Sequence, residues 1–178
     1  MQISLDAYRV LRTVRADDLD EIFELASANR EHLAPWMPWA NPPRREETEV
    51  WLAEALEQAA RDNGFQSVIL ERGRLVGVVG FHAINRRDLS TTIGYWLSAD
   101  AEGRGTMTLA VKALVDLAFR EWGLHRIEIR AATDNARSRA VPERLGFTQE
   151  GVLRDAERFG ERYVDLVVYS VLVTEWSK

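Results

Sequence analysis

The feature that most constrains this chain is a strand, a glycine loop and a long amphipathic helix that follow one another directly. Residues 91–98 have a strand pattern, and Gly103 and Gly105 precede a helix predicted over 106–122. Apolar side chains recur at helical spacing along one side of that helix, at Met107, Ala110, Val111, Leu114, Leu117 and Ala118. Glycine lets backbone N–H groups converge, and a helix N-terminus is electropositive. The segment therefore predicts a site for a phosphate or diphosphate.

Two common phosphate motifs are absent from this segment. The dinucleotide-binding fingerprint needs a third glycine where Thr108 stands, and the Walker loop needs a Gly-Lys-Ser/Thr run that does not occur. Two glycines before a helix are also typical of a plain tight turn, so both readings stay open at this point.

The remaining pattern predicts a mixed sheet in one α+β domain over 1–178. Early strands join into an antiparallel meander, and a strand–helix–strand unit follows. The predicted strands are 8–14, 65–72, 75–84, 91–98, 126–132, one from Phe147 and 163–173; the other predicted helices are 17–29, 46–61 and 137–145.

Composition excludes several classes of protein. The chain has 178 residues, the usual length of one domain, and 23 basic against 28 acidic residues give a net charge of −5. That balance argues against a nucleic-acid partner and a polybasic membrane anchor. Without cysteine there is no disulfide, zinc–thiolate site or cysteine nucleophile, and the three histidines lack metal-ligand spacing. No export signal or membrane span is apparent, so we expect a cytoplasmic protein without a metal.

Two further segments carry candidate site residues. The loop 32–43 holds four of the five prolines together with Trp36 and Trp39, which predicts either an aromatic rim for a substrate or a lid packed over the first helix. Asn135 follows a strand and either caps the next helix or binds a ligand. Three arginines on that helix would bring positive charge near the glycine loop: Arg137, Arg139 and Arg144.

An ordered set of motifs resembles the GNAT N-acetyltransferase superfamily, and within it the RimJ/RimL branch of ribosomal-protein N-terminal acetyltransferases. The set comprises Pro-Trp-Met-Pro-Trp (35–39), Gly-Tyr-Trp-Leu (94–97), Gly-Arg-Gly-Thr-Met-Thr (103–108), Arg-Ile-Glu-Ile-Arg (126–130), Asn-x-x-Ser-Arg (135–139), Leu-Gly-Phe (145–147), Glu-Gly-Val-Leu-Arg (150–154) and Tyr-Val-Asp (163–165). No single piece is specific, but their order along the chain is.

The resemblance implies a central mixed sheet, splayed in the middle, of about seven strands flanked by about four helices. It implies that acetyl-CoA lies in the splay. The coenzyme-binding residues implied are Trp96, Leu97, Ser98, Glu102, Gly103, Arg104, Gly105, Thr106, Met107 and Asn135. The chain departs from the family at Asp100 and Glu102, where carboxylates repel a diphosphate unless they point to solvent.

The implied reaction is direct attack of an amine on the thioester. Many superfamily members have a tyrosine acid at the position of Pro142, so this chain has none there. In the RimL-like branch the implied pair is Ser138, which protonates or hydrogen-bonds the coenzyme sulfur, and Glu157, which accepts the amine proton. From spacing alone Ser138 is a residue of a helix's first turn, and Glu157 is one of 28 acids.

The resemblance implies an acyltransferase that acts on the N-terminal amine of a protein. It also implies a homodimer. Such an amine has a pKa of about 7.7–8.0, so a modest base suffices. We expect Trp36, Trp39 and Tyr95 to contact the substrate. Two other functions stay open. One is acetylation of a small-molecule amine such as an antibiotic, polyamine or amino acid. The other is an acyl-CoA-binding module with little turnover.

Overall fold

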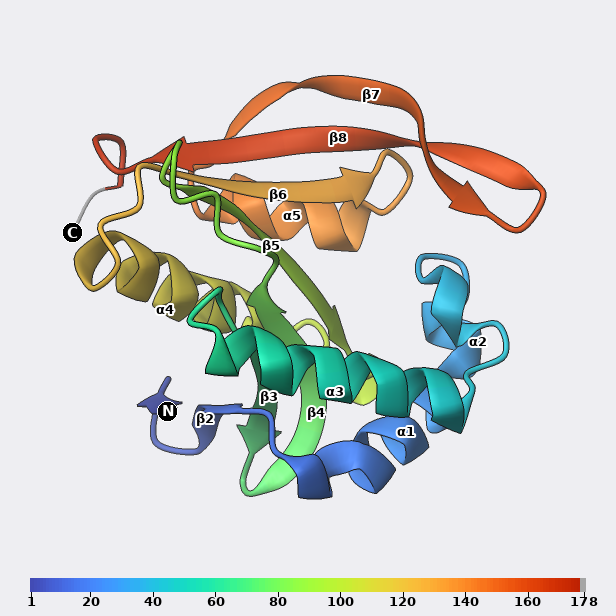
Figure 1. Cartoon of the computed structure of the whole chain (residues 1–178). Coiled ribbons are helices and arrows are strands. Elements are labelled where there is room, and N and C mark those ends of the chain that lie inside the picture. The colour runs from blue at the N-terminus through green and yellow to red at the C-terminus, as the bar shows by residue number, and fades with distance from the viewer. Residues whose placement is uncertain (177–178) are drawn as a thin grey trace.

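The computed structural model describes residues 1–176 and contains an eight-stranded mixed sheet. Residues 177 and 178, which the predicted domain over 1–178 includes, lie outside the described residues. The strand order is β1-β2-β3-β4-β5-β6-β8-β7 (Figure 1). The strands are β1 (Gln2–Ser4), β2 (Arg9–Thr13), β3 (Gln66–Glu71), β4 (Arg74–Phe81), β5 (Ser90–Leu97), β6 (Arg126–Ala132), β7 (Thr148–Phe159) and β8 (Arg162–Leu172).

Helices cover both faces of this sheet. They are α1 (Leu19–Ala28), α2 (Arg30–Leu33), α3 (Arg45–Ala60), α4 (Thr106–Arg120) and α5 (Ala136–Arg144). In Figure 1, α1 and α3 lie across one face of the central strands, and α4 lies on the other side. Among the described residues, no helix is both long enough and apolar enough to cross a membrane.

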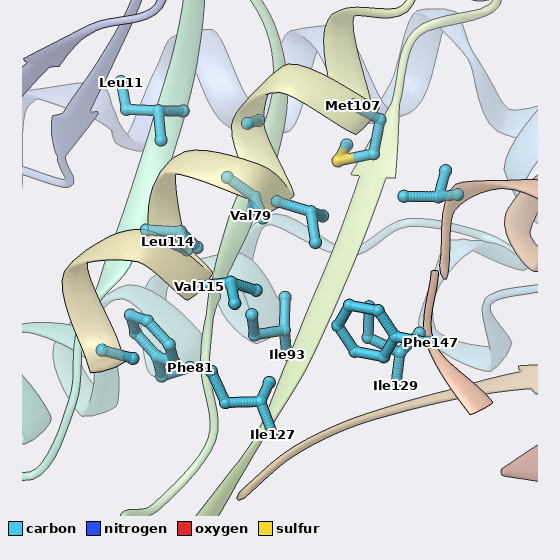
Figure 2. Close-up of a cluster of buried hydrophobic side chains, with 14 of the residues drawn as sticks. Leu11, Val79, Phe81, Ile93, Met107, Leu114, Val115, Ile127, Ile129 and Phe147 are labelled. Atoms are coloured by element: carbon cyan, nitrogen blue, oxygen red, sulfur yellow. The ribbon is translucent and has the colours of Figure 1, made fainter. Parts of the chain in front are cut away.

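Alternation along the central strands builds a core on each face. Val68 of β3 joins the cluster beneath α1 and α3, while its neighbour Ile69 joins the cluster beneath α4. Each fully buried side chain of this size contributes about 1.5–3 kcal/mol to the free energy of unfolding. In Figure 2, Val115 of α4 points toward Ile93 of β5. The predicted stripe of α4 is buried except for Leu117, which is half-buried.

The sheet opens between β5 and β6, and this opening positions the site. β5 pairs with β4 as far as Leu97, but it pairs with β6 only where Ser90–Thr92 lies against Arg126–Glu128 in parallel. Beyond Thr92 the two strands continue without pairing, and they diverge in Figure 1. The predicted meander, the strand–helix–strand unit and the splayed sheet are therefore confirmed.

The structure adds a short strand and a short α-helix that the sequence pattern did not indicate. β1 pairs with β2, with Ile3 opposite Leu11, and α2 spans only Arg30–Leu33. Each covers less than two periods of its hydrophobic pattern, so periodicity has too few positions to reveal it. Sheet and helices thus contain one more strand and one more helix than predicted.

Candidate active site

The glycine loop leaves the start of α4 open to a ligand. Gly103 and Gly105 both have φ of +73°, the left-handed region that favours glycine, and no atom lies within 4 Å of the place where either would carry a Cβ. Gly105 is the N-cap of α4, and no side chain of the described residues caps that helix. The first residues of α4 border a cavity, and their amides lack a side-chain cap and can bind an anion.

A first cavity, of about 1020 Å³, extends from this loop along the end of β5 to the start of α5. It brings together eight of the ten residues that the resemblance implies for the coenzyme: Trp96, Leu97, Glu102, Gly103, Gly105, Thr106, Met107 and Asn135. The side chains of the other two lie elsewhere. Ser98 is fully buried and its hydroxyl donates to Asp100 at 2.6 Å. Arg104 turns outward to Glu71, with a nitrogen–oxygen distance of 2.7 Å.

The two unusual carboxylates of the loop have cationic neighbours. The hydrogen bond from Ser98 lowers the pKa of Asp100, and Arg74 lies 3.5 Å from its carboxylate. Glu102 lines the first cavity and contacts Arg137 at 2.6 Å and His32 at 3.2 Å. Of the pair, only Glu102 therefore faces the predicted anion site, and its charge is opposed by that of Arg137.

Two of the three arginines of α5 lie where the sequence pattern predicts. Arg137 and Arg144 line the first cavity with the glycine loop. The prediction that Arg139 lies near the glycine loop is wrong, because its side chain faces the sheet instead. Its Nε donates to the Tyr169 hydroxyl at 3.0 Å, and its Nη1 donates to the Thr133 carbonyl at 2.9 Å. Helical geometry turns residue 139 away from the side shared by 137 and 144, which lie seven positions apart.

A second cavity, of about 900 Å³, lies on the α3 side of the opening. It is lined by the three residues expected to contact substrate, Trp36, Trp39 and Tyr95, and also by Glu157. The rings of Trp39 and Trp96 meet with centroids 5.8 Å apart. Six residues line both cavities, which therefore adjoin where β5 and β6 separate: Trp36, Met37, Tyr95, Trp96, Asn135 and Ser138.

Glu157 reaches the second cavity from a distorted part of β7. The register between β7 and β8 shifts between Leu153 and Glu157, which then pairs with Val164. Within residues 1–176, no cation forms an ion pair with this carboxylate, and its partial desolvation raises the pKa of Glu157. The group is therefore a free carboxylate that binds a proton more tightly than an ordinary glutamate does.

Ser138 and Tyr95 meet where the two cavities adjoin. The amide of Ser138 donates to Asn135 Oδ1 at 3.1 Å, so Asn135 caps α5. The Tyr95 hydroxyl donates to the Ser138 carbonyl at 2.9 Å, and the Ser138 hydroxyl lies 3.3 Å from the Tyr95 oxygen. Burial raises the pKa of Tyr95, so its hydroxyl stays protonated.

Sequence reasoning missed several residues of the second cavity. His82, just beyond β4, lines it, and desolvation of the ring lowers the pKa of His82, with a smaller contribution from Arg130. Trp51 and Glu54 of α3 line it as well. Val50, the residue before Trp51 on the same helix, is 59% exposed and lines neither cavity. No local signal distinguishes a cavity wall from a core contact.

Known proteins resemble this chain over nearly all of its length. Residues 9–148 match the family model described as an acetyltransferase (GNAT) domain. The chain belongs to the GNAT acetyltransferase family. A relative from Bacillus subtilis, named a putative ribosomal N-acetyltransferase YdaF, is 36% identical over 94% of this chain and 92% of its own length. The ribosomal-protein-serine acetyltransferase of Escherichia coli is 27% identical over 92% of each chain.

Solved structures agree with this family membership. The ribosomal L7/L12 α-N-protein acetyltransferase RimL superposes with a TM-score of 0.90 at 27% identity, covering 97% of this chain and 94% of that one. The microcin C7 self-immunity acetyltransferase MccE, solved with acetyl-CoA and AMP, has a TM-score of 0.89 at 26% identity, covering 96% and 95%. The chain is thus an acyltransferase of the GNAT fold.

Proposed function

We propose that this acyltransferase moves an acetyl group from acetyl-CoA to the N-terminal α-amine of a protein, in a ternary complex. The observation that carries the proposal is the pair of adjoining cavities at the opening between β5 and β6. One cavity begins at the uncapped start of α4, and the other contains the unpaired carboxylate of Glu157. Relatives named as ribosomal-protein acetyltransferases support a protein substrate. The proposal treats residues 1–178 as one acetyltransferase domain.

The first cavity fits the coenzyme. Backbone amides of residues 102–107 would hold the diphosphate, because the left-handed glycines leave space beside the loop and no side chain of the described residues caps α4. Residues 96–98, at the end of β5, have no partner strand on the side that faces β6 and would run beside the pantetheine, opposite Asn135. Arg137 and Arg144 add positive charge along the same wall.

Acetyl-CoA supplies a thioester whose carbonyl carbon the amine nitrogen attacks, and the bond from carbon to sulfur breaks with its electron pair leaving on sulfur. Ser138, which lines both cavities, donates a hydrogen bond to that sulfur. Glu157, on the substrate side, accepts the proton that the amine loses, directly or through a water. The raised pKa of Glu157 suits this role, since a proton acceptor must hold the proton it takes.

The second cavity is proposed to hold the acceptor, with Trp36, Trp39 and Tyr95 as walls. An N-terminal amine with a pKa of about 7.7–8.0 is already about one-tenth deprotonated at neutral pH, whereas a lysine with a pKa of about 10.4 is almost fully charged. One carboxylate is therefore enough for an N-terminal substrate. A small-molecule amine is the second candidate, because aromatic side chains enclose this cavity and MccE has a similar structure.

Release of free coenzyme A thiol, measured with a panel of peptides and small amines, tests the proposal. We expect turnover with peptides that have a free N-terminus and none with the same peptides blocked at that position. Turnover confined to small amines would replace the first candidate with the second. Binding of acetyl-CoA without turnover on any acceptor would contradict both candidates and favour a binding module.

A further inference from the structure

Helix α5 contains a proline where the helix would otherwise complete a hydrogen bond. Pro142 is buried and lies inside α5, six positions after its start. Proline has no backbone N–H, so the carbonyl four residues earlier receives no hydrogen bond from it. That carbonyl belongs to Ser138, the residue proposed to contact the coenzyme sulfur. The gap in the helix ladder therefore falls at the candidate site.

A side chain from the opposite wall of the opening uses the carbonyl that Pro142 leaves free. The Tyr95 hydroxyl donates to it at 2.9 Å across the separation between β5 and α5. A phenol has one proton to donate, so the Tyr95 oxygen can only accept from the Ser138 hydroxyl, which lies 3.3 Å away. The direction of both hydrogen bonds thus follows from the carbonyl, which can only accept, and from the single proton of the phenol.

We propose that Pro142 and Tyr95 are a pair of positioning residues. Pro142 frees the Ser138 carbonyl, and the Tyr95 hydroxyl binds this carbonyl, which holds the first turn of α5 against β5 and keeps the Ser138 hydroxyl at the junction of the two cavities. Without coenzyme, that hydroxyl donates its one proton to the Tyr95 oxygen, and it turns from there to the sulfur when the coenzyme binds. Neither residue acts on the reacting atoms. The inference rests on the proposed function, because it presumes that Ser138 assists departure of the coenzyme sulfur.

A double-mutant cycle with Tyr95→Phe and Pro142→Ala tests the pair. We expect Tyr95→Phe to lower kcat about fivefold to tenfold, the effect of one hydrogen bond, with KM for acetyl-CoA within about twofold. Pro142→Ala supplies an N–H that shares the carbonyl, so kcat falls in the same direction but by less. The double variant should be no slower than Tyr95→Phe alone, because both changes act on one interaction.

Tyr169→Phe is the matched control. The Tyr169 hydroxyl also bonds α5, accepting from Arg139 at 3.0 Å and donating to Glu143 at 2.6 Å, but it lines neither cavity. This variant should keep kcat even where it lowers the free energy of unfolding. Urea unfolding of the same proteins gives a readout without turnover, in which Tyr95→Phe should be less destabilising when combined with Pro142→Ala.

Two results would overturn the pairing: losses in kcat that multiply in the double variant, or wild-type kcat in Tyr95→Phe. Ser138→Ala separates this outcome from failure of the proposed function. If Ser138→Ala is slow while Tyr95→Phe and Pro142→Ala are not, only the positioning inference is wrong. If Ser138→Ala keeps the wild-type rate, or if the protein acetylates no acceptor, the proposed role of Ser138 is wrong. The positioning inference is then wrong as well.

Discussion

Glu157 and Glu102 are both carboxylates on cavity walls, but their surroundings differ. Glu102 contacts Arg137 and His32, whereas none of the described residues forms an ion pair with Glu157. Desolvation without a cation raises the pKa of Glu157 above the ordinary value for glutamate. A carboxylate in this setting suits proton transfer better than structural pairing, which supports Glu157 rather than Glu102 as the proposed proton acceptor.

Glu157→Gln should lower kcat about 100-fold or more, because the amine loses its proton acceptor. The free energy of unfolding at neutral pH should stay equal or rise. The pKa of Glu157 is raised in the folded protein, so stability from this group is present at low pH and is lost as pH rises through that pKa. Glutamine does not ionise, so the variant does not lose stability as the pH rises through this range. Initial rates against pH and urea unfolding measure the two effects.

Wild-type kcat should also rise with pH through the raised pKa of Glu157, and this limb should be absent in Glu157→Gln. Glu161→Gln serves as the control, since Glu161 is an exposed acid in the turn of the same hairpin. It should change neither the rate nor its pH profile. A Glu157→Gln variant with the wild-type rate and profile would show that the proton goes elsewhere.

Two short segments do most to shape the site at the scale of elements. The glycine loop before α4 leaves amides free, and the cap and the proline of α5 set the position of Ser138. Both depend on local backbone chemistry, namely φ of +73° at Gly105, the Asn135 side chain and the missing N–H of Pro142. The long strands and helices hold these two segments on either side of the opening between β5 and β6.

Gly105→Ala should raise KM for acetyl-CoA several-fold with a smaller change in kcat. A non-glycine residue in the left-handed region costs about 1–2 kcal/mol, and the loop can relieve it only by moving its amides. Gly123→Ala is a matched control, because Gly123 also has positive φ, +62°, and open space around it, but follows the far end of α4. Both should unfold more easily, and only Gly105→Ala should bind coenzyme less well. Equal KM values in the two would contradict an anion site at this loop.

Elements with strong local signals could be predicted, and contacts between distant segments could not. The stripe from Met107 to Ala118, the Asn135 cap and the glycine loop were all visible in the sequence. Arg104 turns outward to Glu71, and Arg139 turns toward the sheet to Tyr169, because of partners 33 and 30 positions away. Likewise, Pro142 in the sequence indicated only that a tyrosine was missing, because the Tyr95 contact appears when β5 and α5 meet.

The whole molecule works as two half-sheets joined along three residue pairs. β1 to β5 carry α1 and α3 on one face, while β6, β8 and β7 continue beyond the opening (Figure 1). The buried cluster beneath α4 includes residues from both half-sheets, such as Ile93 of β5 and Ile127 of β6. This packing keeps the strands apart beyond Thr92 and leaves room for two cavities that meet at Ser138.

A crystal structure of the protein with coenzyme A and an acceptor peptide tests this arrangement most directly. We expect the diphosphate on the backbone amides of residues 102–107, the coenzyme sulfur beside the Ser138 hydroxyl, and the peptide amine on the Glu157 side of the opening. A coenzyme bound elsewhere, or a side chain that fills the space between β5 and β6 while the diphosphate leaves the start of α4 untouched, would contradict it.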